Sequence, residues 1–156
     1  MERVATMQQD IGLIVGSGVI PYIALHARIG GQRHGQTSWS NPSRHSLADV
    51  NTFLSCGTMP AREFQENQNE TEPAIVAFSD DPAFLRKISA LDERVKYSKN
   101  SLIIHVDRSK LDDHEELEKG VIDTFAELFI ISRAQCIVGS SSTFSAVAGS
   151  IFLPPS

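Results

Sequence analysis

Residues 21–31 read PYIALHARIGG, and this stretch decides the fold of the chain. Its apolar run is opened by Pro21, is short, and ends at Gly30 and Gly31, as expected for a buried strand followed by a turn. Further apolar runs of this kind predict buried strands at residues 74–78 (AIVAF), 102–106 (LIIHV) and 135–138 (QCIV). Continuous apolar strands are typical of a parallel sheet that helices cover on both faces.

Helical patterns separate these strands. Helices are predicted at residues 46–54, 82–88, 115–133 and 140–151. Residues 58–72 are mixed in character, and we expect a short helix there followed by a polar loop. Strands that alternate with helices predict an α/β fold, with a Rossmann-like parallel sheet flanked by helices.

The length of 156 residues predicts one domain. Within it we expect a lead-in over residues 1–20, a core over 21–152 and a tail over 153–156. No run approaches 18 apolar residues, so no membrane span is predicted. The first residues lack the layout of a signal peptide. Two cysteines 80 positions apart, Cys56 and Cys136, predict neither a disulfide framework nor a metal site.

The charge of the chain is −5 and unevenly spread. A negative balance argues against broad nucleic-acid binding. However, residues 11–48 contain no Asp or Glu, although Arg28, Arg33 and Arg44 lie there. An arginine-bearing segment without carboxylates indicates a local anion site. Surface arginines placed there by chance are the alternative.

Polar residues follow the predicted strands, where an open parallel sheet binds its ligands. Arg28 comes after the first strand, and a guanidinium can hold a phosphate with two parallel hydrogen bonds. Alternatively Arg28 pairs with Asp80 or Asp81 after the second strand, which is compatible with phosphate binding. Residues 139–144 read GSSSTF and place hydroxyls and free backbone N–H groups at a helix start, another anion site, although serine and threonine are also ordinary helix caps.

One acidic residue of the long helix is a further candidate. Glu127 borders the apolar face of the predicted helix at 115–133, where a carboxylate could accept the paired N–H donors of a guanine. A solvated helix face is the alternative. Because His and Cys residues do not cluster at ligand spacing, no metal site is predicted.

Four segments together resemble a known family, the GDP-fucose-dependent fucosyltransferases. The segments are residues 26–30 (HARIG), 75–81 (IVAFSDD), 125–134 (FAELFIISRA) and 139–144 (GSSSTF), in the family's order. The first resembles the family's H-x-R-x-G segment. The resemblance implies one nucleotide-sugar-binding half of a GT-B type glycosyltransferase, so we expect the chain to be part of a larger enzyme.

The resemblance also implies roles for individual residues. Arg28 would hold the β-phosphate and neutralise the departing GDP, Glu127 would read the guanine, and His26 would lie beside the nucleotide. The other positions expected around the donor are Gly30, Asp80, Asp81, Ser142, Thr143 and Phe144. The implied reaction is a metal-independent, inverting transfer of fucose to a hydroxyl of a glycan or protein acceptor. No carboxylate in residues 32–48 can act as general base, which leaves only His34 and His45 in that loop.

Two alternatives stay open. A non-catalytic module would use the same pocket to bind a GDP-sugar without chemistry. A phospho-acceptor signalling domain would use Asp80, Asp81 or Asp107 as acidic strand ends, but would leave the Arg28 segment unexplained. The compartment implied by the family is the ER or Golgi lumen for a eukaryotic protein and the cytoplasm for a bacterial one.

Overall fold

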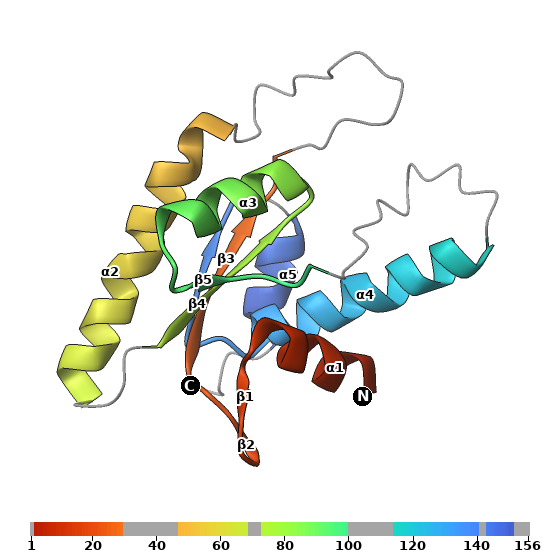
Figure 1. The fold of residues 1–156 in the computed structure, drawn as a ribbon, viewed down its shortest axis with the longest axis horizontal. Helices are drawn as coiled ribbons and strands as arrows, with labels where there is room; N and C mark the ends of the chain where they lie inside the picture. The colour runs from red at the N-terminus through yellow and green to blue at the C-terminus, as the bar shows by residue number, and fades with distance from the viewer. Residues whose placement is uncertain (1, 30–46, 69–72, 100–113, 141–142, 152–156) are drawn as a thin grey trace.

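The computed structural model describes residues 2–29, 47–68, 73–99, 114–140 and 143–151. Its elements in chain order are α1 (Glu2–Ile11), β1 (Ile14–Val15), β2 (Gly18–Val19), β3 (Tyr22–Ala27), the 3-10 turn η1 (Leu47–Asp49), α2 (Val50–Gln68), β4 (Ala74–Ser79), α3 (Pro82–Leu91), β5 (Val95–Lys96), α4 (His114–Ser132), β6 (Cys136–Gly139) and α5 (Thr143–Ile151). Helices cover both faces of a central sheet (Figure 1). The predicted α/β class is confirmed.

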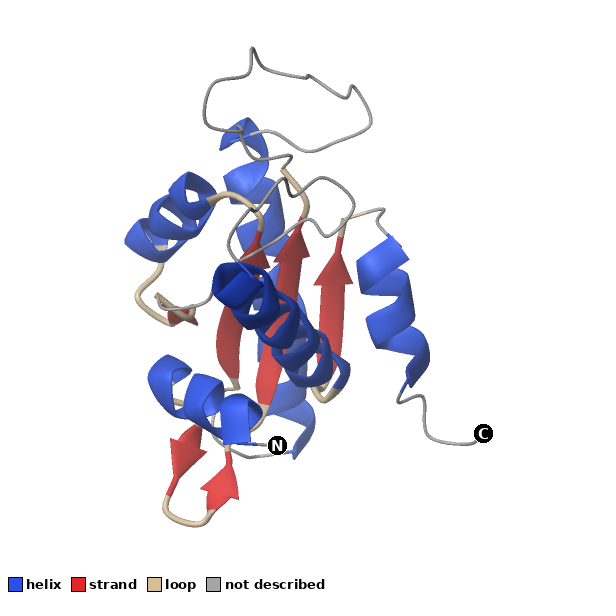
Figure 2. Cartoon of the chain, turned by 90° about the vertical axis from the view of Figure 1, so that its right-hand side faces the viewer, coloured by secondary structure: helices blue, strands red, loops and turns tan. Residues whose placement is uncertain are grey.

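The central sheet has four parallel strands in the order β5-β4-β3-β6. Figure 2 shows the strands running in one direction, so that their carboxyl ends share one edge. Three predicted apolar runs correspond to β3, β4 and β6, whereas the run at 102–106 lies outside the described residues. The fourth described strand is β5, which is two residues long and too short to give a sequence pattern.

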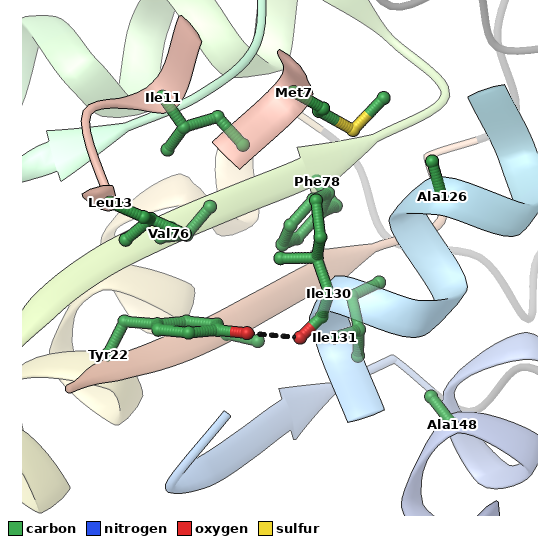
Figure 3. Close-up of a cluster of buried hydrophobic side chains, with 11 residues drawn as sticks. Met7, Ile11, Leu13, Tyr22, Val76, Phe78, Ala126, Ile130, Ile131 and Ala148 are labelled. Carbon is green, nitrogen blue, oxygen red and sulfur yellow. Dashed lines mark hydrogen bonds between the residues drawn. The ribbon is translucent and has the colours of Figure 1, made fainter. Parts of the chain in front are cut away.

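Alternate residues of β3 face two separate helical layers, because successive side chains of a strand point to opposite faces. Leu25 and Ala27 pack in one cluster with buried residues of α2 and α3. Tyr22 and Ala24 pack in the other cluster with residues of α1, α4 and α5. Figure 3 shows Tyr22 in this cluster. There the Tyr22 hydroxyl donates a hydrogen bond of 2.5 Å to the Ile130 carbonyl. Burial raises the pKa of Tyr22 well above its usual value.

Helix α2 corrects the expectation for residues 58–68, because it continues from Val50 through Pro60 to Gln68, whereas residues 69–72 lie outside the described residues. A proline inside a helix removes one hydrogen bond and commonly bends or ends it. Here buried residues occur on both sides of Pro60: Phe53 and Gly57 precede it and Ala61 follows it. Burial of one continuous face therefore favours a single helix over the short helix and loop that its composition predicts.

The first 20 residues are more than a lead-in. Met7 and Ile11 of α1 and Leu13 after it are buried in the core. Arg3 also donates to the Asp123 carboxylate of α4 at 2.6 Å, and Lys119 contacts the same carboxylate at 3.0 Å. The antiparallel pair of β1 and β2 lies at the end of the domain opposite the carboxyl ends of the parallel strands (Figure 2). The amino-terminal segment is thus built into the fold.

Candidate functional site

The strand order places a candidate site between β3 and β6. From β3 the chain passes to β4 on one side, and only later returns to β6 on the other. In an open α/β sheet, ligands bind at the carboxyl ends of the strands where the order reverses in this way. His26 and Gly139 are register partners at that point, Arg28 follows β3 and Ser140 follows β6.

Two hydrogen bonds of Ser140 join the ends of these strands. The Ser140 N–H donates to the His26 carbonyl at 2.9 Å. The Arg28 N–H donates to Ser140 Oγ at 3.0 Å. Because Ser140 is buried, the N–H groups of Ser140 and Arg28 find their hydrogen-bond partners within the protein and not in water. The chain at Arg28 is therefore fixed to the segment that leads into α5.

Asp80 holds the Arg28 segment from the other neighbouring strand. Its Oδ1 accepts a 2.7 Å hydrogen bond from the Ile29 N–H. Its Oδ2 lies 3.2 Å from Arg28 Nε, an ion pair in which the side chain of Asp80 is 3% exposed and that of Arg28 28%. The carboxylate is thus sequestered, while part of the Arg28 side chain stays exposed. The pairing with Asp80 considered for Arg28 from the sequence is present.

Asp81 has a different position and role. It is the N-cap of α3, and its Oδ1 accepts a 2.7 Å hydrogen bond from the Ala83 N–H. Pro82 then occupies the first turn, where a proline fits because its missing N–H would have no helical partner. The structure therefore gives Asp81 a capping role and separates it from the Asp80–Arg28 pair.

His26 lies beneath this arrangement with its ring held from two directions. Its Nδ1 is 2.6 Å from Ser145 Oγ of α5. The Phe144 ring lies 5.0 Å from the imidazole, centroid to centroid, with the planes tilted by 32°. Burial lowers the pKa of His26 to about 4, against a smaller raising effect of the Asp80 charge and with a further small lowering by Arg28. The imidazole is therefore neutral at pH 7.

We call His26, Arg28, Asp80, Ser140, Phe144 and Ser145 the Arg28 cluster. Its members come from the ends of β3, β4 and β6 and from the first turn of α5. Four of them, His26, Arg28, Asp80 and Phe144, are candidates from the sequence. Ser140 belongs to the GSSSTF segment identified as an anion site, but its own role becomes visible only in three dimensions, and Ser145 is not a candidate from the sequence.

Gly139 makes the contact between α5 and β3 possible. A Cβ at this position would lie 2.7 Å from Ser145 Cβ and 2.8 Å from Ser145 Oγ. These distances are shorter than van der Waals contact, so only glycine leaves room for Ser145 beside His26. The glycine of the GSSSTF segment thus has a packing reason that the sequence does not reveal.

Replacing Gly139 with alanine is expected to lower the free energy of unfolding by about 1–3 kcal/mol, the usual effect of overpacking. The added methyl group would push Ser145, and with it α5, away from His26. Chemical denaturation measures the change. Gly149→Ala in the same helix is the matched control, because a Cβ there meets nothing within 4 Å. Equal stability of the two variants would contradict the close packing at Gly139.

Glu127 is buried in α4, with 7% of its surface exposed. It precedes Ile130, which packs on the same face of the sheet as Tyr22 and Ala24. The solvated helix face considered as the alternative for Glu127 is therefore wrong. The proposed contact of Glu127 with guanine stays a prediction.

Gly30 and Ser142 lie outside the described residues. Thr143 begins α5, which places its backbone at the helix start beside the Arg28 cluster. The loop histidines His34 and His45 also lie outside the described part of the chain.

Neither a metal group nor a membrane helix occurs in the part of the chain that is described. Within it, no group of three His, Cys, Asp or Glu side chains is placed to bind a metal ion. No helix of those same residues has the length and apolar character needed to cross a membrane. Donor binding without metal stays a prediction.

A hollow of about 440 Å³ lies at the other end of β3, between α1 and the end of α4. Its lining is mainly apolar, with Gln8, Arg133 and Gln135 as polar groups. Arg133 Cζ lies 4.8 Å from the centroid of the Phe129 ring, over which it stacks. We place the candidate site at the Arg28 cluster, because ligands of open parallel sheets bind at the carboxyl ends of the strands.

Comparison with known proteins assigns no family to this chain. It matches no protein-family model and no curated protein. Function must therefore be inferred from the Arg28 cluster and from the sequence motifs.

Proposed function

We propose that this domain binds a nucleoside diphosphate sugar at the carboxyl ends of β3 and β6, and that the sugar nucleotide is GDP-fucose. The observation that supports this most is the placement of Arg28. It stands at the reversal of strand order, with Asp80 fixing its position and part of its side chain exposed. A fixed, partly exposed cation at this point favours an anionic ligand.

A diphosphate fits the Arg28 cluster chemically. The guanidinium can donate two parallel hydrogen bonds to phosphate oxygens. The first turn of α5 lies beside it, and helix starts favour anions because their N–H groups lack helical partners. The ion pair with Asp80 offsets the charge of Arg28, so attraction for an anion also depends on the partial positive charge at the start of α5, a helix that contains no Asp or Glu.

GDP-fucose is favoured by the resemblance of four segments to the fucosyltransferases. Residues from three of these segments meet in the Arg28 cluster: His26 and Arg28 from the first, Asp80 from the second, and Phe144 from the last. Their meeting supports the resemblance, because the family's segments would have to form one nucleotide-sugar site. Glu127 belongs to the remaining segment and is the residue proposed to read guanine.

The proposed reaction is the inverting transfer of fucose from GDP-fucose to a hydroxyl of a glycan or protein, without metal. Arg28 would stabilise the charge that builds on the diphosphate as the sugar–phosphate bond breaks. Catalysis of this kind depends on positioning and on fixed charge. The domain would be the donor-binding half of a GT-B type enzyme. A non-catalytic module with the same pocket would bind the donor and give no fucose transfer in an assay.

A phospho-acceptor role fits the structure less well. An acceptor carboxylate must be open to the phosphoryl donor, whereas the side chain of Asp80 is 3% exposed and bonded to Ile29 and Arg28. Asp81 is engaged as the cap of α3. Asp107 lies outside the described residues.

Calorimetric titration with GDP, GDP-fucose, UDP and ADP, in the absence of metal, tests the proposal. We expect saturable binding of GDP and GDP-fucose and much weaker binding of UDP and ADP. Equal binding of all three nucleoside diphosphates would support a diphosphate site and remove the guanine assignment. No binding to a protein shown to be folded would contradict the proposed function.

Replacing Glu127 with glutamine is expected to reduce the preference for GDP over ADP by about tenfold or more. Hydrogen bonds to a charged group contribute about 1.5–3 kcal/mol, and the amide can no longer accept two N–H donors as an anion. Paired titrations with GDP and ADP measure the preference. Glu118→Gln is the matched control, since Glu118 is exposed on the same helix. An undiminished preference would mean that another residue reads the base.

A further inference from the structure

The contact between His26 and Ser145 is closer than packing alone requires. The two side chains approach to 2.6 Å between Nδ1 and Oγ, although they are 119 residues apart in sequence. Gly139 lies opposite His26 in the sheet and leaves the space through which Ser145 reaches the ring. Phe144 stacks beside the same ring. Three residues of the β6–α5 segment, Gly139, Phe144 and Ser145, thus converge on one imidazole.

The hydrogen bond with Ser145 bears on where the imidazole carries its proton. A neutral imidazole has one donor nitrogen and one acceptor nitrogen. His26 is neutral at pH 7, because burial lowers its pKa to about 4. Nδ1 is engaged with Ser145, whereas Nε2 has no hydrogen-bond partner among the described residues. His26 as a whole keeps 7% of its surface exposed.

The chemistry of the ligand determines which tautomer of His26 can form a hydrogen bond to it. Phosphate oxygens accept hydrogen bonds and donate none at neutral pH. His26 can therefore assist a diphosphate only if Nε2 carries the proton. That tautomer requires Nδ1 to be an acceptor, and the Ser145 hydroxyl is a donor at the right distance.

We propose that Ser145 is a positioning residue whose hydroxyl donates to His26 Nδ1 and so fixes the proton on Nε2, which then donates to an oxygen of the bound nucleoside diphosphate. This inference rests on the proposed function, since it gives His26 a place in the same site. Ser145 itself need not touch the ligand. Its effect on binding passes through the tautomer of His26.

Nitrogen NMR of protein labelled with ¹⁵N-histidine tests the tautomer directly. In the ligand-free wild-type chain we expect His26 Nδ1 to show the shift of an unprotonated nitrogen and Nε2 that of a protonated one. Ser145→Ala should give shifts averaged between the two tautomers. Ser145→Thr keeps the hydroxyl and should restore the wild-type pattern. Loss of packing alone would not produce this selective effect and its rescue.

GDP titration of the same three proteins tests the role in binding. We expect about a fivefold to tenfold loss of affinity in Ser145→Ala, less than the full loss of a hydrogen bond to a charged group because the useful tautomer stays partly populated. Ser145→Thr should bind as the wild type does. Equal affinity of Ser145→Ala and the wild type would overturn the role of Ser145.

The two measurements separate the inference from the proposed function. A proton on Nδ1 in the wild-type protein would overturn the inference even if GDP binds. If the tautomer is as expected and GDP does not bind, the proposed function fails, and with it the role given to Nε2. Should Ser145→Ala not fold, the wild-type spectrum still decides the tautomer, and the shift of Nε2 on GDP addition decides its contact with the ligand.

Discussion

Replacing Arg28 with alanine is expected to weaken GDP binding by about tenfold to a hundredfold. A charge-assisted hydrogen bond contributes about 1.5–3 kcal/mol, and each 1.4 kcal/mol corresponds to about a factor of ten in affinity. Arg28→Lys should lie between the alanine variant and the wild type, because an ammonium keeps the charge but not the planar pair of donors. Calorimetric titration with GDP measures all three affinities.

Two controls make the Arg28 result specific. Arg62→Ala removes an exposed arginine of α2 and should leave the affinity for GDP unchanged. Because Arg28 pairs with the buried Asp80, the alanine variant also loses some stability, so its folded fraction is measured before titration. Unchanged affinity in folded Arg28→Ala would remove Arg28 from the site and contradict the proposed function.

Acidification is expected to destabilise the protein through His26 by about 3 kcal/mol between pH 6.5 and pH 4. In the unfolded chain His26 takes up a proton as the pH falls below 6.5. In the folded protein it does so only near pH 4, since burial disfavours the charged ring. Unfolding is therefore accompanied by proton uptake between pH 6.5 and pH 4. The contribution of His26 to the free energy of unfolding is fully present above pH 6.5 and is lost as the pH falls toward 4. Denaturant titrations across the window measure the loss.

His26→Gln isolates this contribution. The other histidines and the carboxylates titrate in both proteins, so the difference in unfolding free energy between wild type and variant reports on His26. We expect the stability advantage of the wild-type chain to shrink by about 3 kcal/mol from pH 6.5 to pH 4. A difference that does not change with pH would show that His26 is not buried in a neutral form.

The parallel sheet could be predicted from the sequence where strands are long and apolar. The runs around Ile23, Val76 and Ile137 correspond to three adjacent strands. Because β3 and β4 are almost wholly buried, their residues are mainly apolar, whereas β6 is only partly buried. The Asp81-Pro82 cap likewise marks the start of α3. In contrast, β5 has only two residues, and its pairing with β4 depends on tertiary structure.

Helix α1 likewise cannot be predicted from a local sequence pattern. In α1 the buried residues Met7 and Ile11 stand among polar side chains, and Gln8 is buried as well. Its stability comes from packing on α4 and from the pair of Arg3 with Asp123. A partner 120 residues away leaves no local pattern.

The candidate site was predictable in its charged members and not in its supporting ones. Arg28 and Asp80 follow apolar strands, so strand periodicity and the geometry of parallel sheets place them at one edge. Ser140 and Ser145 have the same side chain as several neighbours, and only their partners distinguish them. The guanine-reading role of Glu127 rests on the family resemblance, although its burial agrees with a position at the border of the apolar face.

The most direct test of the account is to follow the backbone amide NMR signals of ¹⁵N-labelled protein during GDP addition. We predict that the largest shifts cluster at Arg28 and Ile29 after β3, at Asp80, at Ser140 and in the first turn of α5. Shifts centred instead on Gln8 and Arg133, at the hollow beside the start of β3, would contradict the placement of the site at the Arg28 cluster.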